Sequence, residues 1–350
     1  MKKDLIELLR CNKVICFNCD DYQYEFSQLN DNIKFYTPIY EDKLILENFD
    51  TIVGKVSDIK FLNEIFWKYS NFRNIIVLGV SNSSEIIEPK SKYQNTKLWD
   101  IIAYYAKDDI SCGGWYNSYN HEKFSTEEMN DFVDNIEYKL SPYLHNNSTV
   151  LEIGCSSGLT MFRLAPKVKK YIGTDFSQQM INRNYTKVHN KKIYNIDLFC
   201  VSAENIDTLK FNNIDVVIIN SVIQLFDGYH YFYRVLKKIN KLLNNKSVIF
   251  IGDIMDLKKK DELISTAISY KKIHSSSNTK LDFSNDLFFS EEFFRDLEYD
   301  YPYEILDISN KLYTIKNELT DYRYDVILKY NKNINNENKK RLKNQYFFVV

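Results

Sequence analysis

The hydrophobic pattern from Trp99 to about Tyr330 alternates between short apolar runs and longer stretches with helical spacing. The run Ile214 to Ile219 is continuously apolar, as expected of a strand that is covered on both faces. Residues 98–105 and 125–140 carry apolar positions at helical spacing. Such alternation predicts a doubly wound, mostly parallel, Rossmann-like α/β sheet. We expect strands at 149–153, 170–174, 196–201, 214–219 and 247–252.

The pattern changes after the last of these strands. Residues 291–297 have helical spacing, whereas 311–315 and 322–330 are apolar segments joined by a short polar loop. An antiparallel hairpin that closes the parallel sheet accounts for these two segments, and it brings the expected sheet to seven strands. Residues 331–350 are rich in Asn and Lys, and we expect a C-terminal tail whose apolar tip, 346–350, either docks or frays.

The N-terminal part of the chain has a similar pattern on a smaller scale. Apolar runs at 13–17, 50–56 and 74–80 predict short strands, and 58–69 predicts a helix between them. A polar stretch, 81–95, follows as a linker. We therefore expect three parts: a small α/β accessory or docking domain at 1–90, the main domain at 91–330 and the tail at 331–350.

Charge and cysteine content narrow the classes of partner. Lys and Arg number 46 against 47 Asp and Glu, so no global field favours nucleic acid or an anionic membrane, and we expect neither as a partner. We find no signal-like or membrane-spanning apolar run, and we expect a cytoplasmic protein. Six cysteines are too few for a disulfide framework in this length. Cys16 and Cys19 form a C-x-x-C pair, which is either redox-active, half of a zinc site or, as we favour, two buried thiols.

Candidate chemistry begins at residues 150–160, where an apolar strand runs into a turn of small residues and then a helix. The turn places Gly154 and Gly158 four residues apart in a chain with nine glycines, and a turn without side-chain bulk lets a ligand approach the backbone. The Gly-Lys-Ser/Thr end of a phosphate-binding loop is missing. Asp175 ends the next strand about twenty residues further on, where an acid hydrogen-bonds ribose hydroxyls. These features predict a nucleoside ligand.

The pattern Glu-x-Gly-x-x-x-Gly at 152–158 resembles motif I of class I S-adenosylmethionine (SAM) methyltransferases. Three further segments, 113–119, 217–226 and 249–253, resemble the methyltransferase domains embedded in nonribosomal peptide synthetases. The resemblance extends over residues 99–330 and implies SAM as cofactor. The cofactor-binding residues that it implies are Glu152, Gly154, Cys155, Ser156, Gly158, Asp175, Phe176, Ser177, Ala203, Glu204, Asn220 and Ser221.

The resemblance also implies a reaction. Those domains mostly N-methylate an aminoacyl group that a carrier protein holds as a thioester. The chain has no Gly-Gly-His-Ser or Gly-Gly-Asp-Ser carrier motif, so we expect an amino acid or a carrier-bound aminoacyl or peptidyl intermediate to be reached in trans, in nonribosomal-peptide-type or related small-molecule biosynthesis. C- or O-methylation of an acyl or polyketide intermediate, and a scaffold that does not catalyse, are the alternatives.

Four residues are candidates for the catalytic step. Asn220 and Gln224 follow the fourth strand, where an amide oxygen orients an amine, although Asn220 would also serve to cap the next helix. Tyr119, with Trp115, is either a lid over the donor methyl or a surface aromatic. His230 is a titratable group near this face, or a surface residue.

Overall fold

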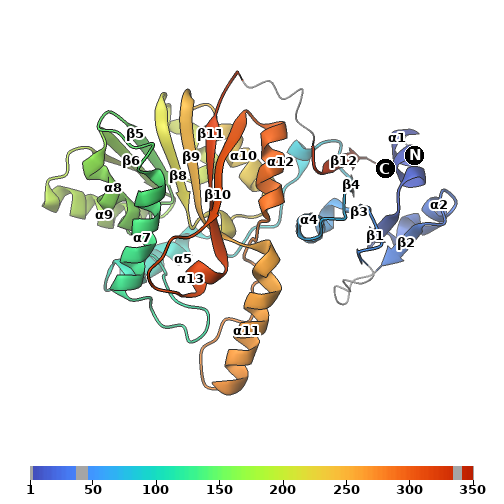
Figure 1. Ribbon diagram of the computed structural model, residues 1–350, viewed down its shortest axis with the longest axis horizontal. Helices are drawn as coiled ribbons and strands as arrows, with labels where there is room; N and C mark the ends of the chain where they lie inside the picture. The colour runs from blue at the N-terminus through green and yellow to red at the C-terminus, as the bar shows by residue number, and fades with distance from the viewer. Residues whose placement is uncertain (1–2, 37–45, 334–340, 350) are drawn as a thin grey trace.

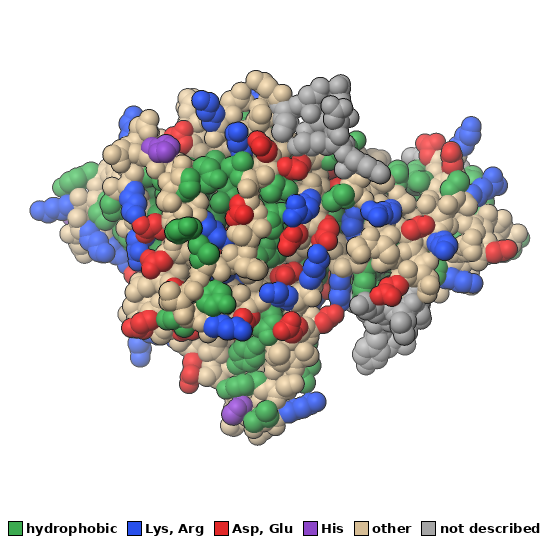
Figure 2. Space-filling model, in the orientation of Figure 1, with side chains coloured by type: hydrophobic (Ala, Val, Ile, Leu, Met, Phe, Trp, Pro, Cys, Tyr) green, Lys and Arg blue, Asp and Glu red, His purple; other side chains and the backbone are tan. Residues whose placement is uncertain are grey.

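The protein contains two β-sheets that lie side by side in the computed structural model (Figure 1). The structure describes residues 3–36, 46–333 and 341–349. Within these ranges no helix is both long enough and apolar enough to cross a bilayer. Lys and Arg side chains are interspersed with Asp and Glu over the face shown in Figure 2, as the balanced composition predicts.

The larger sheet has seven described strands in the order β10-β11-β9-β8-β5-β6-β7, and β11 alone among them runs opposite to the other six. This confirms the predicted doubly wound, mostly parallel sheet. Its strands are β5 (Thr149–Ile153), β6 (Lys170–Asp175), β7 (Ile196–Cys200), β8 (Ile214–Asn220), β9 (Leu243–Met255), β10 (Tyr303–Asn310) and β11 (Arg323–Tyr330).

The first strand of the terminal hairpin is β10 and not 311–315, where we expected it. The backbone at 312–315 bonds to side chains of helix α7 (Thr126–Leu140) instead of to a strand: Asn135 accepts from Leu312 N, and Asp131 accepts from Thr314 N. Lys311 is buried, with its ammonium 3.2 Å from Asp253. The segment 311–315 is therefore held against α7 by hydrogen bonds and does not pair in the sheet, and its Leu312 and Tyr313 side chains are exposed.

Helices cover both faces of the larger sheet. Alternate residues of β5 divide between the faces: Val150 belongs to the apolar cluster that includes Phe132 and Met161, whereas Leu151 belongs to the cluster that includes Phe232. The helices of this unit are α5 (Thr96–Tyr105), α6 (Asp109–Cys112), α7, α8 (Leu159–Leu164), α9 (Gln178–Lys191), α10 (Tyr229–Ile239), α11 (Lys260–Ile273), α12 (Glu291–Asp300) and α13 (Glu318–Asp321).

The smaller sheet is wholly parallel, with the order β12-β4-β3-β1-β2. It comprises β1 (Val14–Phe17), β2 (Ile33–Tyr36), β3 (Thr51–Lys55), β4 (Asn74–Leu78) and β12 (Asn344–Phe348), with α1 (Lys3–Cys11), α2 (Gln23–Ser27) and α4 (Ile59–Lys68). Cys16 and Cys19 are buried free thiols, as we favoured, and burial raises the pKa of Cys19 to about 12.

The end of the chain belongs to this smaller sheet, which corrects the expected tail at 331–350. β12 pairs with β4, and Phe348 is buried against the core around Leu5 and Leu9. Lys343, just before β12, donates to the carbonyl oxygens of Phe66 and Tyr69 at the end of α4. All of the larger sheet is consequently inserted between the fourth and fifth strands of the smaller one.

The two units share one apolar core. Trp67 of α4 packs edge-on against Phe293 of α12, with ring centroids 5.3 Å apart. Residues 81–95, which we expected to be a linker, lie against the larger unit, and their Glu88 side chain is buried beside α10. We call this segment the strap.

Candidate functional site

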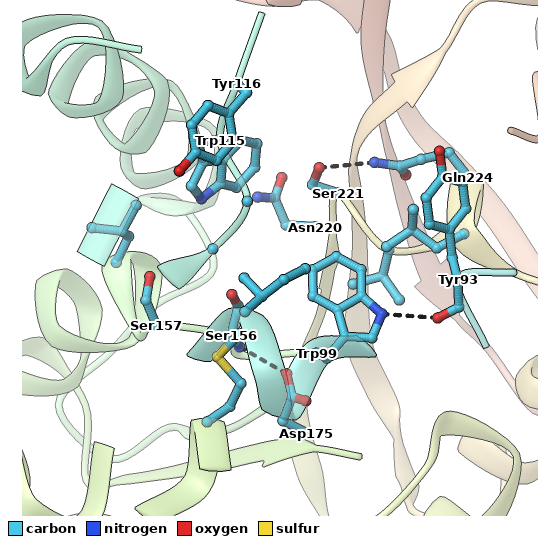
Figure 3. A pocket seen from close by; sticks show the side chains of 18 of the residues that line it. Tyr93, Trp99, Trp115, Tyr116, Ser156, Ser157, Asp175, Asn220, Ser221 and Gln224 are labelled. Carbon is cyan, nitrogen blue, oxygen red and sulfur yellow. Dashed lines mark hydrogen bonds between the residues drawn. The ribbon is translucent and has the colours of Figure 1, made fainter. Parts of the chain in front are cut away.

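A cavity of about 930 Å³ opens at the carboxyl ends of the central strands of the larger sheet (Figure 3). Parallel sheets of this kind bind ligands at that edge. Helix α5, the strap and the segment 113–124 contribute the wall opposite the strands. The predicted cofactor residues that line the cavity are Glu152, Gly154, Cys155, Ser156, Asp175, Phe176, Ala203, Asn220 and Ser221.

The turn after β5 has the conformation that its glycines suggested. Gly154 and Gly158 have φ of 78° and 86°, a left-handed region that residues with a Cβ rarely adopt. A Cβ on Gly154 would stand 2.5 Å from Val222, so the turn also requires a small residue for space. Gly158 itself begins α8 and does not line the cavity.

Two carboxyl groups lie beneath this turn, buried and protonated more easily than usual. Burial raises the pKa of Glu152 to about 8, although the Tyr171 hydroxyl donates to it at 3.0 Å. Burial also raises the pKa of Asp175 to about 6, against the opposing effect of the Ser177 and Ser156 amides that donate to it. A cationic ligand would stabilise the charged form of both groups.

The segment after β8 presents amide oxygens to the cavity. Gln224 Nε2 donates to Ser221 Oγ at 2.8 Å, and Ser221 has φ of 58° (Figure 3). Asn220 Oδ1 and Gln224 Oε1 are buried and accept no hydrogen bond from any described residue. The alternative that Asn220 caps the next helix is wrong, because that short helix has Val222 at its N-cap and no side-chain cap bond.

Besides Gly158, four predicted site residues lie outside the cavity lining. His230 is buried, with Nδ1 3.2 Å from Glu88, and Tyr119 bonds to Thr266 of α11. Glu204 pairs with Arg234. Ser177 caps α9 by accepting from Met180 N. The structure therefore does not place His230 or Tyr119 where a group could reach a bound substrate in this conformation, whereas Trp115 does line the cavity.

Several lining residues were not predicted from the sequence. Trp99 lies across the cavity from Asn220 and donates to the Tyr93 carbonyl at 2.8 Å (Figure 3). Charged residues from late segments complete the wall: Lys280, Asp286, Glu318 and Arg323. No local motif marks them, because they meet the cavity only through the packing of segments far apart in the chain.

Residues 151–249 match the family of methyltransferase domains. The strand order and the glycine turn described above agree with this match. The chain contains a class I, SAM-dependent methyltransferase domain.

Relatives of this methyltransferase occur within nonribosomal peptide synthetases. The chain is 29% identical to chondramide synthase of Chondromyces crocatus over 225 residues, which are 61% of this chain and 6% of that protein. It is 28% identical over 219 residues to a probable non-canonical nonribosomal peptide synthetase of Salinispora arenicola, covering 61% of this chain and 3% of the relative. The chain thus spans a small part of the length of these proteins.

A solved structure with a similar fold is phosphoethanolamine N-methyltransferase 1 of Haemonchus contortus. The two are 14% identical, with a TM-score of 0.52, over 70% of this chain and 50% of the other. This similarity concerns the fold.

The residues at the cavity fit SAM. Ser156 Oγ and Ser157 Oγ are buried without a hydrogen-bond partner among the described residues, which leaves polar atoms for a polar ligand beside the glycine turn. Glu152 and Asp175 supply carboxylates for a cation and for ribose hydroxyls. We expect these residues to hold the cofactor.

Proposed function

We propose that the protein is an N-methyltransferase whose acceptor is the amine of an amino acid with a masked carboxyl group, as in an aminoacyl or peptidyl thioester on a carrier protein. The observation that carries the proposal is the pair of buried amide oxygens, Asn220 Oδ1 and Gln224 Oε1, without donors among the described residues. Buried acceptors need donors, and an amine supplies them.

The charges around the cavity support a masked carboxyl group. Of the four Lys and Arg residues in the described lining, three pair with carboxylates: Arg323 with Asp253, Lys280 with Asp286, and Lys123 with Asp108. The fourth, Lys107, is exposed. A free amino acid would bring a carboxylate into a cavity whose inner cations are already neutralised, and this desolvation is unfavourable.

The chemistry requires alignment more than activation. SAM, when bound, would supply a methyl group on a sulfonium. The sulfur would depart as a neutral thioether, so no general acid would be needed to protonate it. Asn220 Oδ1 and Gln224 Oε1 would each accept a hydrogen bond from one N–H group of a neutral amine. The amine lone pair would then face the methyl carbon. Methyl transfer would form one nitrogen–carbon bond and break one sulfur–carbon bond, and the resulting ammonium would lose its proton to water.

A direct assay tests this proposal. The protein is incubated with methyl-labelled SAM and either alanine or its N-acetylcysteamine thioester, and products are analysed by fragmentation mass spectrometry. We expect label on nitrogen with the thioester and little or none with alanine. Label on carbon or oxygen, or faster methylation of alanine, would contradict the proposal.

A further inference from the structure

One wall of the cavity is held from outside the methyltransferase domain. We call residues 280–287 the acceptor loop, because its members Lys280, Phe283 and Asp286 line the cavity. Within the loop, Lys280 Nζ is 2.8 Å from the Asp286 carboxylate. At its end, Leu287 N donates to the Gln224 carbonyl at 2.9 Å. The loop therefore contacts the residue whose side chain we expect to bind the acceptor amine.

The outer side of the acceptor loop touches α4 of the smaller unit. Lys60 Nζ donates to the Ser284 carbonyl at 3.0 Å. One turn further along α4, Glu64 pairs with Lys260, whose ammonium lies 5.1 Å from the ring centre of Phe288. Phe288 directly follows the loop and is buried. The first contact joins the N-terminal unit to the loop directly, and the second reaches the residue after the loop through Lys260.

The strap binds the same region from a second side. Ser91 N donates to Asp227 Oδ1 at 2.7 Å, and Lys92 N donates to Asn285 Oδ1 at 3.4 Å. Gln94 Nε2 donates to the Leu225 carbonyl, next to Gln224. Tyr93 faces the cavity, and its hydroxyl is 3.4 Å from Lys280 Nζ. The strap thus both lines the cavity and holds the residues around Gln224.

We propose that the N-terminal unit is a structural part of the acceptor site, in which α4 and the strap hold the acceptor loop, and through it Gln224, in the position that acceptor binding requires. This inference rests on the proposed function for its kinetic consequence. Lys60 is then a positioning residue, since it lies outside the cavity lining and would not touch the reacting atoms. SAM binding should be independent of Lys60, because the glycine turn, Glu152 and Asp175 lie at the strands of the larger sheet and not at α4.

Two lysines of α4 provide a matched test in the full-length protein. Lys60→Met removes the bond to the acceptor loop, whereas Lys68→Met removes the ion pair with Asp261 of α11, which lies outside the loop. With alanyl N-acetylcysteamine thioester as probe, we expect Lys60→Met to raise KM about three- to tenfold, the size of one lost hydrogen bond, with the SAM Kd unchanged. Lys68→Met should leave both constants within about twofold, and Lys60→Arg should restore KM.

Hydrogen exchange gives a readout that does not depend on activity. Lys60→Met should speed exchange in peptides covering 219–228 and 280–290 at an unchanged melting temperature, and Lys68→Met should not. Unchanged exchange in both peptides, or an unchanged KM, would overturn the inference. If the wild-type protein does not methylate the thioester, the proposed function fails for that acceptor, while the exchange measurement still decides whether α4 holds the loop.

Discussion

Glu152 is the residue whose protonation should report cofactor binding most directly. Its raised pKa, about 8, arises from burial beside the cavity, and SAM brings positive charge to that cavity. Because the cation favours the carboxylate, we expect SAM affinity to rise with pH up to about 8, by at most about tenfold per pH unit for one linked proton. Calorimetry across pH 5.5–8.5 measures this slope.

Glu152→Gln provides the control for that slope. The variant should bind SAM more weakly at pH 8 and show a shallower pH dependence, leaving the smaller effect of Asp175 below about pH 6. Folding stability without ligand depends on pH in the opposite direction. The folded state holds the Glu152 proton more tightly than the unfolded chain, so the contribution of Glu152 to stability falls as pH rises from about 4.5 to 8. A wild-type SAM affinity that is flat with pH would refute this account.

Substitution of Asn220 distinguishes a role in aligning the acceptor from a role in stabilising the fold, because the side chain caps no helix. We expect Asn220→Ala and Asn220→Asp to lower kcat on the order of tenfold to hundredfold, while the SAM Kd changes by less than about threefold, because the lost contact matters most in the transition state. Single-turnover rates and calorimetry measure the two quantities. An Asn220→Ala variant with full kcat and a lowered melting temperature would assign the residue a structural role instead.

At the scale of elements, Lys343 connects the start of β12 to the end of α4 by hydrogen bonds. Its ammonium is buried against the Phe66 and Tyr69 carbonyls, and desolvation lowers the pKa of Lys343 to about 7. The unfolded chain therefore holds this proton more tightly between about pH 7 and 10.5, and the contribution of Lys343 to stability should rise with pH over that range. Urea unfolding at pH 7 and 9 should show a larger gap between wild type and Lys343→Met at pH 9. The exposed Lys332→Met serves as control, and an equal gap at both pH values would contradict the expectation.

Strong apolar runs made the strands at the sheet centres predictable. The edge strands β10 and β12, whose apolar runs are weaker, were missed. β8 was found because it is covered on both faces, whereas β10 mixes Glu304 and Asp307 with its apolar residues at an exposed sheet edge. β12 was predicted as a tail, because its five residues follow a long Asn- and Lys-rich stretch and pair with a strand far away in the chain. Pairing of this kind leaves no local pattern.

The same contrast applies to the site. The glycine turn and Asp175 were predictable, because each sits at a strand end within one local motif. Trp99, Lys280 and Arg323 reach the cavity from a helix, a loop and a distant strand. Their positions depend on tertiary packing, which a spacing pattern cannot report. His230 looked available in sequence, but the strap brings Glu88 over it and buries it.

At the scale of the molecule, the shared core implies one cooperative unit. Trp67 and Phe293 bury each other across the two sheets, and removal of either unit would expose that face. We expect a single calorimetric transition for the full chain, and a deletion of residues 1–80 that aggregates or melts much earlier. Two separate transitions, or a soluble deletion variant with an unchanged melting temperature, would show that the units fold independently.

The insertion between β4 and β12 has a consequence for how the protein is made. Residues 79–343 are synthesised after β4 and before its partner strand β12. During that time one edge of β4 has no strand to pair with. At about 5–20 residues per second, that interval is on the order of tens of seconds. The catalytic domain therefore has time to fold first, and the nascent chain carries an unpaired strand edge that other chains are able to join until β12 has been synthesised.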